Sequence, residues 1–192
     1  LLALTLAGGW VESRIRSIPL KKQYSEAKIL GGGHSNIVLL ATKNGQKVVI
    51  KKYGLSGVVL GWIAKKVLPT PNPGGFSPRD RFNNDLTVFT DFEKAGIPAS
   101  RLLASDPKNL INTSSFVEGD PLPMLLDNEP AVRAAGQSLR QAHDLGWAII
   151  DNQLSNYIIG QDGRAYFIDL EHAWKDKEGK YKALDIAIFL SY

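Results

Sequence analysis

Cysteine is absent from this chain of 192 residues, which excludes disulfides and thiolate metal sites. The composition is compatible with a reducing compartment, and we expect a cytoplasmic protein. The chain also lacks internal repeats, low-complexity tracts and the interleaved aromatic and basic residues that indicate nucleic-acid binding. Its charge bias is mild, with a net charge of +4 and a pI near 9.2. An ordinary solvated surface explains this bias, with attraction to a polyanion as the alternative.

Long hydrophobic runs are missing as well, since residues 1–9 and 55–68 are both too short to cross a bilayer. No basic segment precedes residues 1–9, so we interpret them as the start of a fragment or a processed end rather than as a signal peptide. Residues 55–68 are interrupted by Lys65 and Lys66. They predict a helix packed on its own domain, with an interfacial amphipathic helix as the alternative.

Hydrophobic residues make up 44% of the chain and charged residues 22%, which predicts one globular domain, in one or two lobes. Residues 28–53 predict three strands, with a glycine-rich turn after the first and a hairpin turn at 43–45. Residues 70–75, rich in proline and glycine, predict a loop. A helical stripe over 79–95 ends at Gly96, in a Gly-Ile-Pro sequence.

The second half predicts more helix than strand. The expected elements are strands at 101–104 and 110–116, a turn at 118–121, a helix at 129–145, a polar loop at 151–156, a hairpin through 161–163 with a strand ending at Asp169, and a helix at 183–190. Asp185 would cap that last helix and could also brace the polar loop. The order predicts an α+β fold of two lobes, a β-rich one over 1–118 and a mostly helical, minimal or truncated one over 119–192. A ligand would bind in the cleft between them.

The polar residues near the end of the chain carry the clearest chemistry. Asp151, Asn156 and Asp169 follow the layout of a phosphoryl-transfer site, with the Asn five positions after the first Asp and an apolar run before the second Asp. Asp151 would orient a hydroxyl nucleophile, and Asn156 and Asp169 would hold Mg²⁺ against the phosphates of ATP. The alternative for 151–156 is a turn rich in Asp and Asn.

Two features upstream strengthen this interpretation. A turn of consecutive residues Gly31, Gly32, Gly33, His34, Ser35 and Asn36 lies between two predicted strands. Its amides could face phosphate oxygens, although a plain hairpin turn is equally compatible, and no Gly-Lys-Ser/Thr of a P-loop follows. Lys51 directly follows an apolar strand, so we expect it, rather than Lys52, to face the cleft; a solvated pair of lysines is the alternative.

Together these residues resemble the protein-kinase-like superfamily over nearly the whole chain, from about Leu30. The closest likeness is to the atypical RIO-type and KEOPS-complex kinases of archaea and to bacterial lipopolysaccharide core kinases. Those families share a helix ending in His-x-x-Gly before Asp-x-x-x-x-Asn, matched here by His143 and Gly146 before Asp151 and Asn156. They also share a helix ending in Gly-Ile-Pro.

The resemblance implies roles for further residues. Lys51 would bind phosphate and assist catalysis, paired with Asp85 of the helix that follows its strand. The backbone of Phe116, Val117 and Glu118 would meet adenine. His143 would be a structural residue rather than a general base. The chain departs from the kinase pattern at Asp-Leu-Glu, residues 169–171, in place of Asp-Phe-Gly, and the short segment after it implies that the platform for peptide substrates is missing.

We therefore expect an ATP- and Mg²⁺-dependent phosphotransferase, with an atypical serine/threonine protein kinase as the favoured form. One alternative is a kinase of a small hydroxylated molecule, such as a sugar, a lipopolysaccharide core or an aminoglycoside. Another is an ATPase switch subunit within a larger RNA-processing complex. A catalytically silent nucleotide-binding scaffold is less compatible with the sequence, because four polar residues are all intact: Lys51, Asp151, Asn156 and Asp169.

Overall fold

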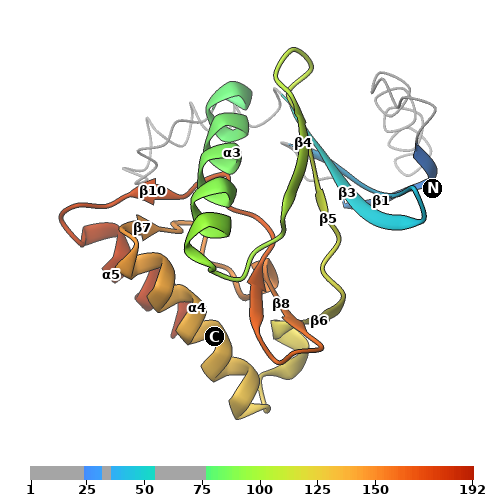
Figure 1. The fold of residues 1–192 in the computed structure, drawn as a ribbon. Helices are drawn as coiled ribbons and strands as arrows, with labels where there is room; N and C mark the ends of the chain where they lie inside the picture. The colour runs from blue at the N-terminus through green and yellow to red at the C-terminus, as the bar shows by residue number, and fades with distance from the viewer. Residues whose placement is uncertain (1–23, 32–35, 55–76) are drawn as a thin grey trace, which may run out of the picture.

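The computed structural model describes residues 24–31, 36–54 and 77–192 (Figure 1). Four residues of the expected glycine-rich turn, Gly32, Gly33, His34 and Ser35, lie outside the described residues. So do the apolar stretches 1–9 and 55–68 and the expected loop at 70–75. In the part of the chain that is described, no helix combines the length and the apolar character needed to cross a membrane.

The first half forms an antiparallel sheet of five strands in the order β1-β2-β3-β5-β4. The strands are β1 (Tyr24–Gly31), β2 (Asn36–Lys43), β3 (Gln46–Tyr53), β4 (Leu102–Asp106) and β5 (Ile111–Ser115). Asn44 and Gly45 both have positive φ, 51° and 77°, which is the geometry of the predicted two-residue hairpin. In the β3–β5 ladder Lys51 lies opposite Asn112, so their side chains share one face of the sheet.

Helix α3 (Pro78–Ala95) lies against the sheet, close to its predicted position. Ser77 caps its first turn. Gly96 ends the helix in the left-handed conformation at φ 70°, and this end is the one that the sequence predicts. The N-terminal half of the helix meets the sheet, where Phe82 packs edge-on against Tyr53 at 5.8 Å between ring centroids. Its C-terminal half contributes Phe92 to the core of the second region.

The second region contains α4 (Glu129–Asp144) and α5 (Lys180–Phe189), which lie together at the lower left of Figure 1. Two 3₁₀ turns span Leu122–Leu125 and Leu154–Asn156. Five short strands complete it: β6 (Gly119–Pro121), β7 (Trp147–Ala148), β8 (Tyr157–Gly160), β9 (Ala165–Phe167) and β10 (Trp174–Lys175). The described part of the chain is thus α+β, with a β-rich sheet region and three α-helices.

Three local predictions for this region are wrong. The turn expected at 118–121 is strand β6, because pairing with β8 outweighs the local turn preference of Gly-Asp-Pro. The strand expected to reach Asp169 ends at Phe167. Helix α5 begins three residues before the expected 183, after Gly179 in the left-handed conformation.

Two clusters of buried residues form the core. A small one lies within the sheet around Leu39 and Ile50. The larger one joins α3, α4 and the short strands, with Phe92, Tyr157 and Phe167 near its centre. The chain after α3 is also tied to β9, since Phe167 N donates to Pro98 O at 3.2 Å. Helix α3 therefore joins the sheet to the second region.

Candidate functional site

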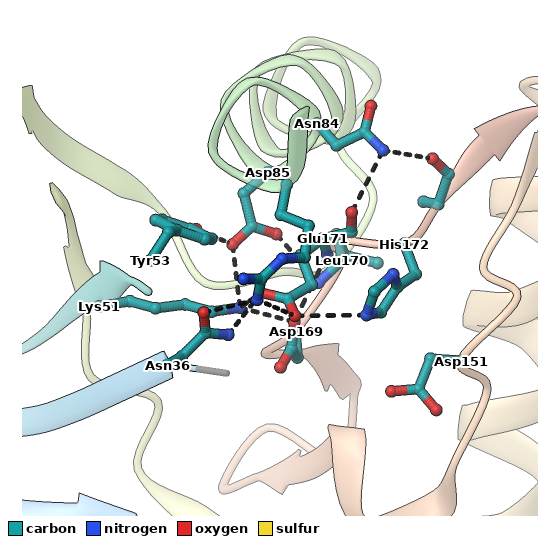
Figure 2. Close-up of polar contacts among 12 residues, drawn as sticks. Asn36, Lys51, Tyr53, Asn84, Asp85, Asp151, Asp169, Leu170, Glu171 and His172 are labelled. Atoms are coloured by element: carbon teal, nitrogen blue, oxygen red, sulfur yellow. Dashed lines mark hydrogen bonds and ion pairs between the residues drawn. The ribbon is translucent and has the colours of Figure 1, made fainter. Parts of the chain in front are cut away.

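Lys51 is a buried amine surrounded by three carboxylates. The residue is 8% exposed. Its Nζ lies 2.7 Å from Asp169 Oδ1, 2.8 Å from Glu171 Oε2 and 3.2 Å from Asp85 Oδ2. Figure 2 shows these four side chains pointing toward one another. The three residues that sequence analysis grouped from separate segments, Lys51, Asp85 and Asp169, thus meet in one place.

Three elements bring these side chains together. Lys51 lies on β3, the middle strand of the sheet, and Asp85 is on the buried face of α3. Asp169 and Glu171 lie just after β9. The Asp85 carboxylate accepts hydrogen bonds from Lys51 Nζ, from the Tyr53 hydroxyl and, at 3.1 Å, from the backbone N–H of Leu170. Asp85 therefore anchors the segment of Asp169 to the helix.

The charges in this cluster influence one another strongly. Burial tends to lower the pKa of Lys51, but the carboxylates of Asp169 and Asp85 outweigh it, and the pKa lies well above its ordinary value. Burial raises the pKa of Asp85 to about 6, against the opposing charge of Lys51. Burial also acts to raise the pKa of Glu171, but the charge of Lys51 and the contact with His172 outweigh it and lower that pKa. Lys51 is therefore a permanent cation that keeps Glu171 ionised.

Two residues that the sequence did not indicate, Glu171 and Arg81, extend the cluster. Arg81 is 2% exposed, and its guanidinium donates to Glu171 Oε1 at 3.1 Å, to Asn36 Oδ1 at 2.7 Å and to Gly54 O at 2.7 Å. Asn36 Nδ2 in turn donates to Glu171 Oε2 at 2.6 Å. The amide of Asn36, a predicted cofactor contact, is thus engaged within the protein. The available signal was Arg81 four residues before Asp85, which places two charges on one helix face.

Asp85, Asp169 and Glu171 offer oxygen atoms within 4.8 Å of one another, a donor set that suits a hard cation. Lys51 already lies between them and contacts all three. A cation at their centre would meet the ammonium of Lys51, so in this arrangement the lysine balances their charge. The side of Asp169 that faces the cavity is a better place for a metal, since its side chain is 36% exposed.

The predicted metal ligand Asn156 lies near this exposed side of Asp169. Both residues line the same cavity, and Asn156 O accepts from the backbone N–H of Ile168 at 3.1 Å. Asn156 Nδ2 donates to Asp151 O at 3.0 Å, which commits the amide nitrogen to the loop and leaves the oxygen as the atom for a cation. Asn156 and Asp169 therefore have the chemistry that a magnesium site needs.

Asp185 braces the loop that carries Asp151. It is fully buried and accepts the backbone N–H groups of Ile149 and Ile150, each at 2.7 Å. Its carboxylate also lies 2.9 Å from His143 Nε2, so His143 is a structural partner, as expected. Ile150 has a φ of 67°, an unfavourable conformation for a β-branched residue that these contacts maintain.

The prediction that Asp185 caps α5 is wrong, because it lies inside the helix and the capping position is Gly179. Asp151 itself is half-buried, and its carboxylate accepts from Gln153 Nε2 at 2.8 Å. It is not among the residues that line the main cavity. In Figure 2 it lies apart from the lysine cluster, beyond His172. The negative charges of Glu171, Asp169 and Asp151 raise the pKa of His172, although burial opposes them.

The main cavity has a volume of about 510 Å³ and lies between the sheet and the second region. Apolar side chains from both sides line it: Leu30, Val38 and Val49 from the sheet, and Ile158 and Ile168 from the second region. Lys51, Asp85 and Asp169 also line it, as do Phe116 and Val117, two of the predicted adenine contacts. Glu118, the third, lines a separate hollow and forms an exposed ion pair with Lys47. Gly31 ends β1.

Comparison with known proteins adds a likeness of fold alone. No protein-family model and no curated protein matches this chain. A solved structure described as the Rv3197–erythromycin complex from Mycobacterium tuberculosis is similar in fold, with a TM-score of 0.59 and 17% sequence identity. The match covers 85% of this chain and 52% of that one, so the present chain spans about half the length of its structural neighbour.

Proposed function

We propose that this protein is an ATP- and Mg²⁺-dependent phosphotransferase with a two-lobed, protein-kinase-like arrangement. The observation that carries the proposal is the contact of Lys51 with both Asp85 and Asp169 in the lining of a cavity between two regions. A lysine that is 2.7 Å from the carboxylate expected to bind the metal is well placed to contact the phosphates bound to that metal. The cavity of about 510 Å³ lies within the range of small-molecule sites.

The fit of ATP follows from the chemistry of the lining. A flat base suits the space between Val38 and Val49 on one side and Ile158 on the other. Lys51 would donate to the phosphates, and Asn156 and Asp169 would hold Mg²⁺. The metal, when bound, neutralises charge on the phosphates and keeps them in line.

Asp151 would aim the acceptor. Its carboxylate accepts the proton of a hydroxyl group as the hydroxyl oxygen forms a bond to the γ-phosphorus and the bond to the ADP oxygen breaks. Asp185 acts through the backbone of residues 149 and 150 and is a positioning residue. Because phosphoryl transfer depends mainly on positioning and charge, a rigid loop matters more here than a strong base.

Two classes of phosphate acceptor are compatible with the proposal. An atypical serine/threonine protein kinase is the interpretation favoured by the sequence. A small hydroxylated acceptor is favoured by the segment between Asp169 and α5, which is short and partly taken up by β10, paired with β7. Incubation with labelled ATP alone, with proteins, and with sugars or aminoglycosides separates protein kinase, small-molecule kinase and ATPase.

The substitution Asp151→Asn tests the proposal directly. We expect turnover of Mg·ATP to fall by about 100-fold or more, because the variant cannot orient and deprotonate the nucleophile. Binding of Mg·ATP, measured by calorimetry, should change by less than about twofold, since Asp151 does not line the cavity. Asp144→Asn, at the exposed end of α4, is the matched control and should retain full turnover.

Two results would contradict the proposal. One is turnover by Asp151→Asn at the rate of the unmodified protein. The other is a Lys51→Met variant whose ATP affinity and turnover equal those of the unmodified protein. That result would mean that Lys51 does not contact the phosphates. Circular dichroism must show that Lys51→Met is folded, because the substitution leaves buried carboxylates without their cation.

A further inference from the structure

His172 is a partly exposed imidazole that lies between the lysine cluster and Asp151 (Figure 2). Its side chain is 23% exposed, so part of the ring is open to a ligand, and its Nε2 lies 3.3 Å from Glu171 Oε1. Like Asp151, it is not among the residues that line the main cavity. His172 therefore lies on the side of the site where the proposed function puts the acceptor rather than the base.

Helix α3 fixes the backbone on both sides of His172. Asn84 Nδ2 donates to Glu171 O and to Ala173 O, each at 3.2 Å, and these are the carbonyl groups just before and just after His172. Figure 2 shows the Asn84 side chain reaching from the helix to this segment. The contact of the ring with Glu171 then orients the imidazole. A side chain held in this way has the fixed position that phosphoryl transfer depends on.

Three carboxylates favour the protonated form of this imidazole. Burial acts to lower the pKa of His172, but the hydrogen bond with Glu171 and the negative charges of Glu171, Asp169 and Asp151 outweigh it and raise the pKa. Asp169 would hold the metal and Asp151 would orient the nucleophile. A cation therefore lies close to both of the carboxylates between which the transfer is proposed to take place.

The transferred phosphoryl group must pass near this cation. In the proposed function Asn156 and Asp169 hold Mg²⁺ against the phosphates, and Asp151 aims the hydroxyl, so transfer takes place between Asp169 and Asp151. Negative charge is spread over the three equatorial oxygens of the phosphoryl group during transfer. A positively charged side chain placed beside these oxygens in advance stabilises the transition state.

We propose that His172 is a further catalytic residue, whose imidazole contacts the transferred phosphoryl group and offsets the charge on its oxygens. His172 neither gives nor accepts a proton in this step, because the hydroxyl proton goes to Asp151. The inference rests on the proposed function, since it needs a phosphoryl group between Asp169 and Asp151. The alternative is that His172 only holds the carboxylate of Glu171 in place.

A transition-state analogue tests the contact without an identified acceptor. Mg·ADP with aluminium fluoride mimics the transferred group, and Mg·ADP lacks it. We expect calorimetry on the unmodified protein to give an affinity about 100-fold or more higher for the analogue than for Mg·ADP. His172→Gln keeps an N–H that can reach Glu171 but loses the charge, so this preference should fall by about tenfold or more. His172→Arg restores the charge and should recover most of the preference.

Arg140→Gln is the control, because it removes an exposed cation of α4. It should retain the full preference. An unchanged preference in His172→Gln would overturn the inference and leave His172 as a partner of Glu171, with the proposed function intact. An equal loss in His172→Arg and His172→Gln would also overturn it. If the unmodified protein binds the analogue no more tightly than Mg·ADP, the proposed function is wrong and the inference falls with it.

Nuclear magnetic resonance decides the question even if the variants do not fold. The chain has three histidines, so the imidazole signals of His172 can be assigned in the unmodified protein. Addition of the analogue should shift these signals more than addition of Mg·ADP does, because only the analogue carries a group at the position of transfer. Equal shifts with the two ligands would overturn the contact.

Discussion

Glu171 is the residue that most changes the surroundings of Lys51 relative to what the sequence indicated. Its carboxylate contacts Lys51, Arg81 and Asn36 and is almost fully buried. One side chain therefore links the start of β2, the helix α3 and the segment after β9. Removing the charge would leave two buried cations with fewer partners, which is the costly way to break a buried ion pair.

We predict that Glu171→Gln lowers the free energy of unfolding by about 3 kcal/mol, because the ion pairs of Glu171 with Lys51 and Arg81 are buried. Urea denaturation followed by circular dichroism measures it. Glu129→Gln is the matched control, since Glu129 pairs with Arg133 on the exposed face of α4. The control should change stability by less than about 0.5 kcal/mol. Equal effects of the two substitutions would show that Glu171 contributes no more than a surface pair.

The carboxylate of Asp176 fixes where helix α5 begins. Asp176 Oδ1 accepts the backbone N–H groups of Glu178 and Gly179, at 3.2 and 3.0 Å, and Oδ2 accepts those of Tyr181 and Lys182, at 2.7 and 3.0 Å. Burial would raise the pKa of Asp176, but these four donors outweigh it and lower the pKa. The helix that begins here carries Asp185 to the loop of Asp151.

The lowered pKa predicts a pH dependence. A depressed folded-state pKa contributes stability that is present above the unfolded pKa of about 3.9 and is lost as the pH falls through the lower folded value. Asp176→Asn should therefore lower the free energy of unfolding by about 1–2 kcal/mol at pH 7, as for loss of a helix cap. The difference from the unmodified protein should shrink below about pH 4.

Urea denaturation between pH 3 and pH 7 measures this difference. Asp144→Asn, an exposed substitution on α4, is the control and should follow the unmodified protein. A constant difference between Asp176→Asn and the unmodified protein at every pH would mean that the ionised carboxylate is not the form that holds the helix.

For the molecule as a whole, α3 is the element that joins the sheet to the second region. Tyr53 of the sheet packs on Phe82 near the start of the helix, and Phe92 near its end packs on Phe167 at 5.5 Å between ring centroids. The buried charges of Lys51 and Asp85 lie between these two contacts. The sheet and the second region should therefore unfold together.

Phe92→Ala tests this cooperation. We expect a loss of about 3–5 kcal/mol of unfolding free energy, because Phe92 is fully buried and leaves a cavity. Native-state hydrogen exchange should show the same loss for the slowest amides of β3 and of α4. Leu103→Ala, on a partly exposed residue of β4, is the control and should have a small effect. Undiminished protection of β3 in Phe92→Ala would mean that the sheet is stable by itself.

Local patterns predicted much of the fold and several of the site's residues. The turn at Asn44 and Gly45, the end of α3 at Gly96 and the extent of α4 follow from neighbours in the chain, so short-range preferences were enough. The meeting of Lys51 with Asp169 was predicted from the order of motifs. Strand β6 was not predicted, because it depends on pairing with β8. The internal position of Asp185 was not predicted either, because it depends on where α5 begins.

The order of residues alone indicated the candidate site: one strand lysine, and an Asp, an Asn and a second Asp at set spacings. It could not settle their partners, because Glu171, Arg81 and Asn36 are far apart in the chain and meet only when α3 packs against the sheet. That Asn112 Oδ1 is buried without a hydrogen-bond partner in the described part of the chain is likewise visible only in the tertiary structure. Whether a polar group is satisfied depends on everything that surrounds it in space, which the identity of its neighbours along the chain does not specify.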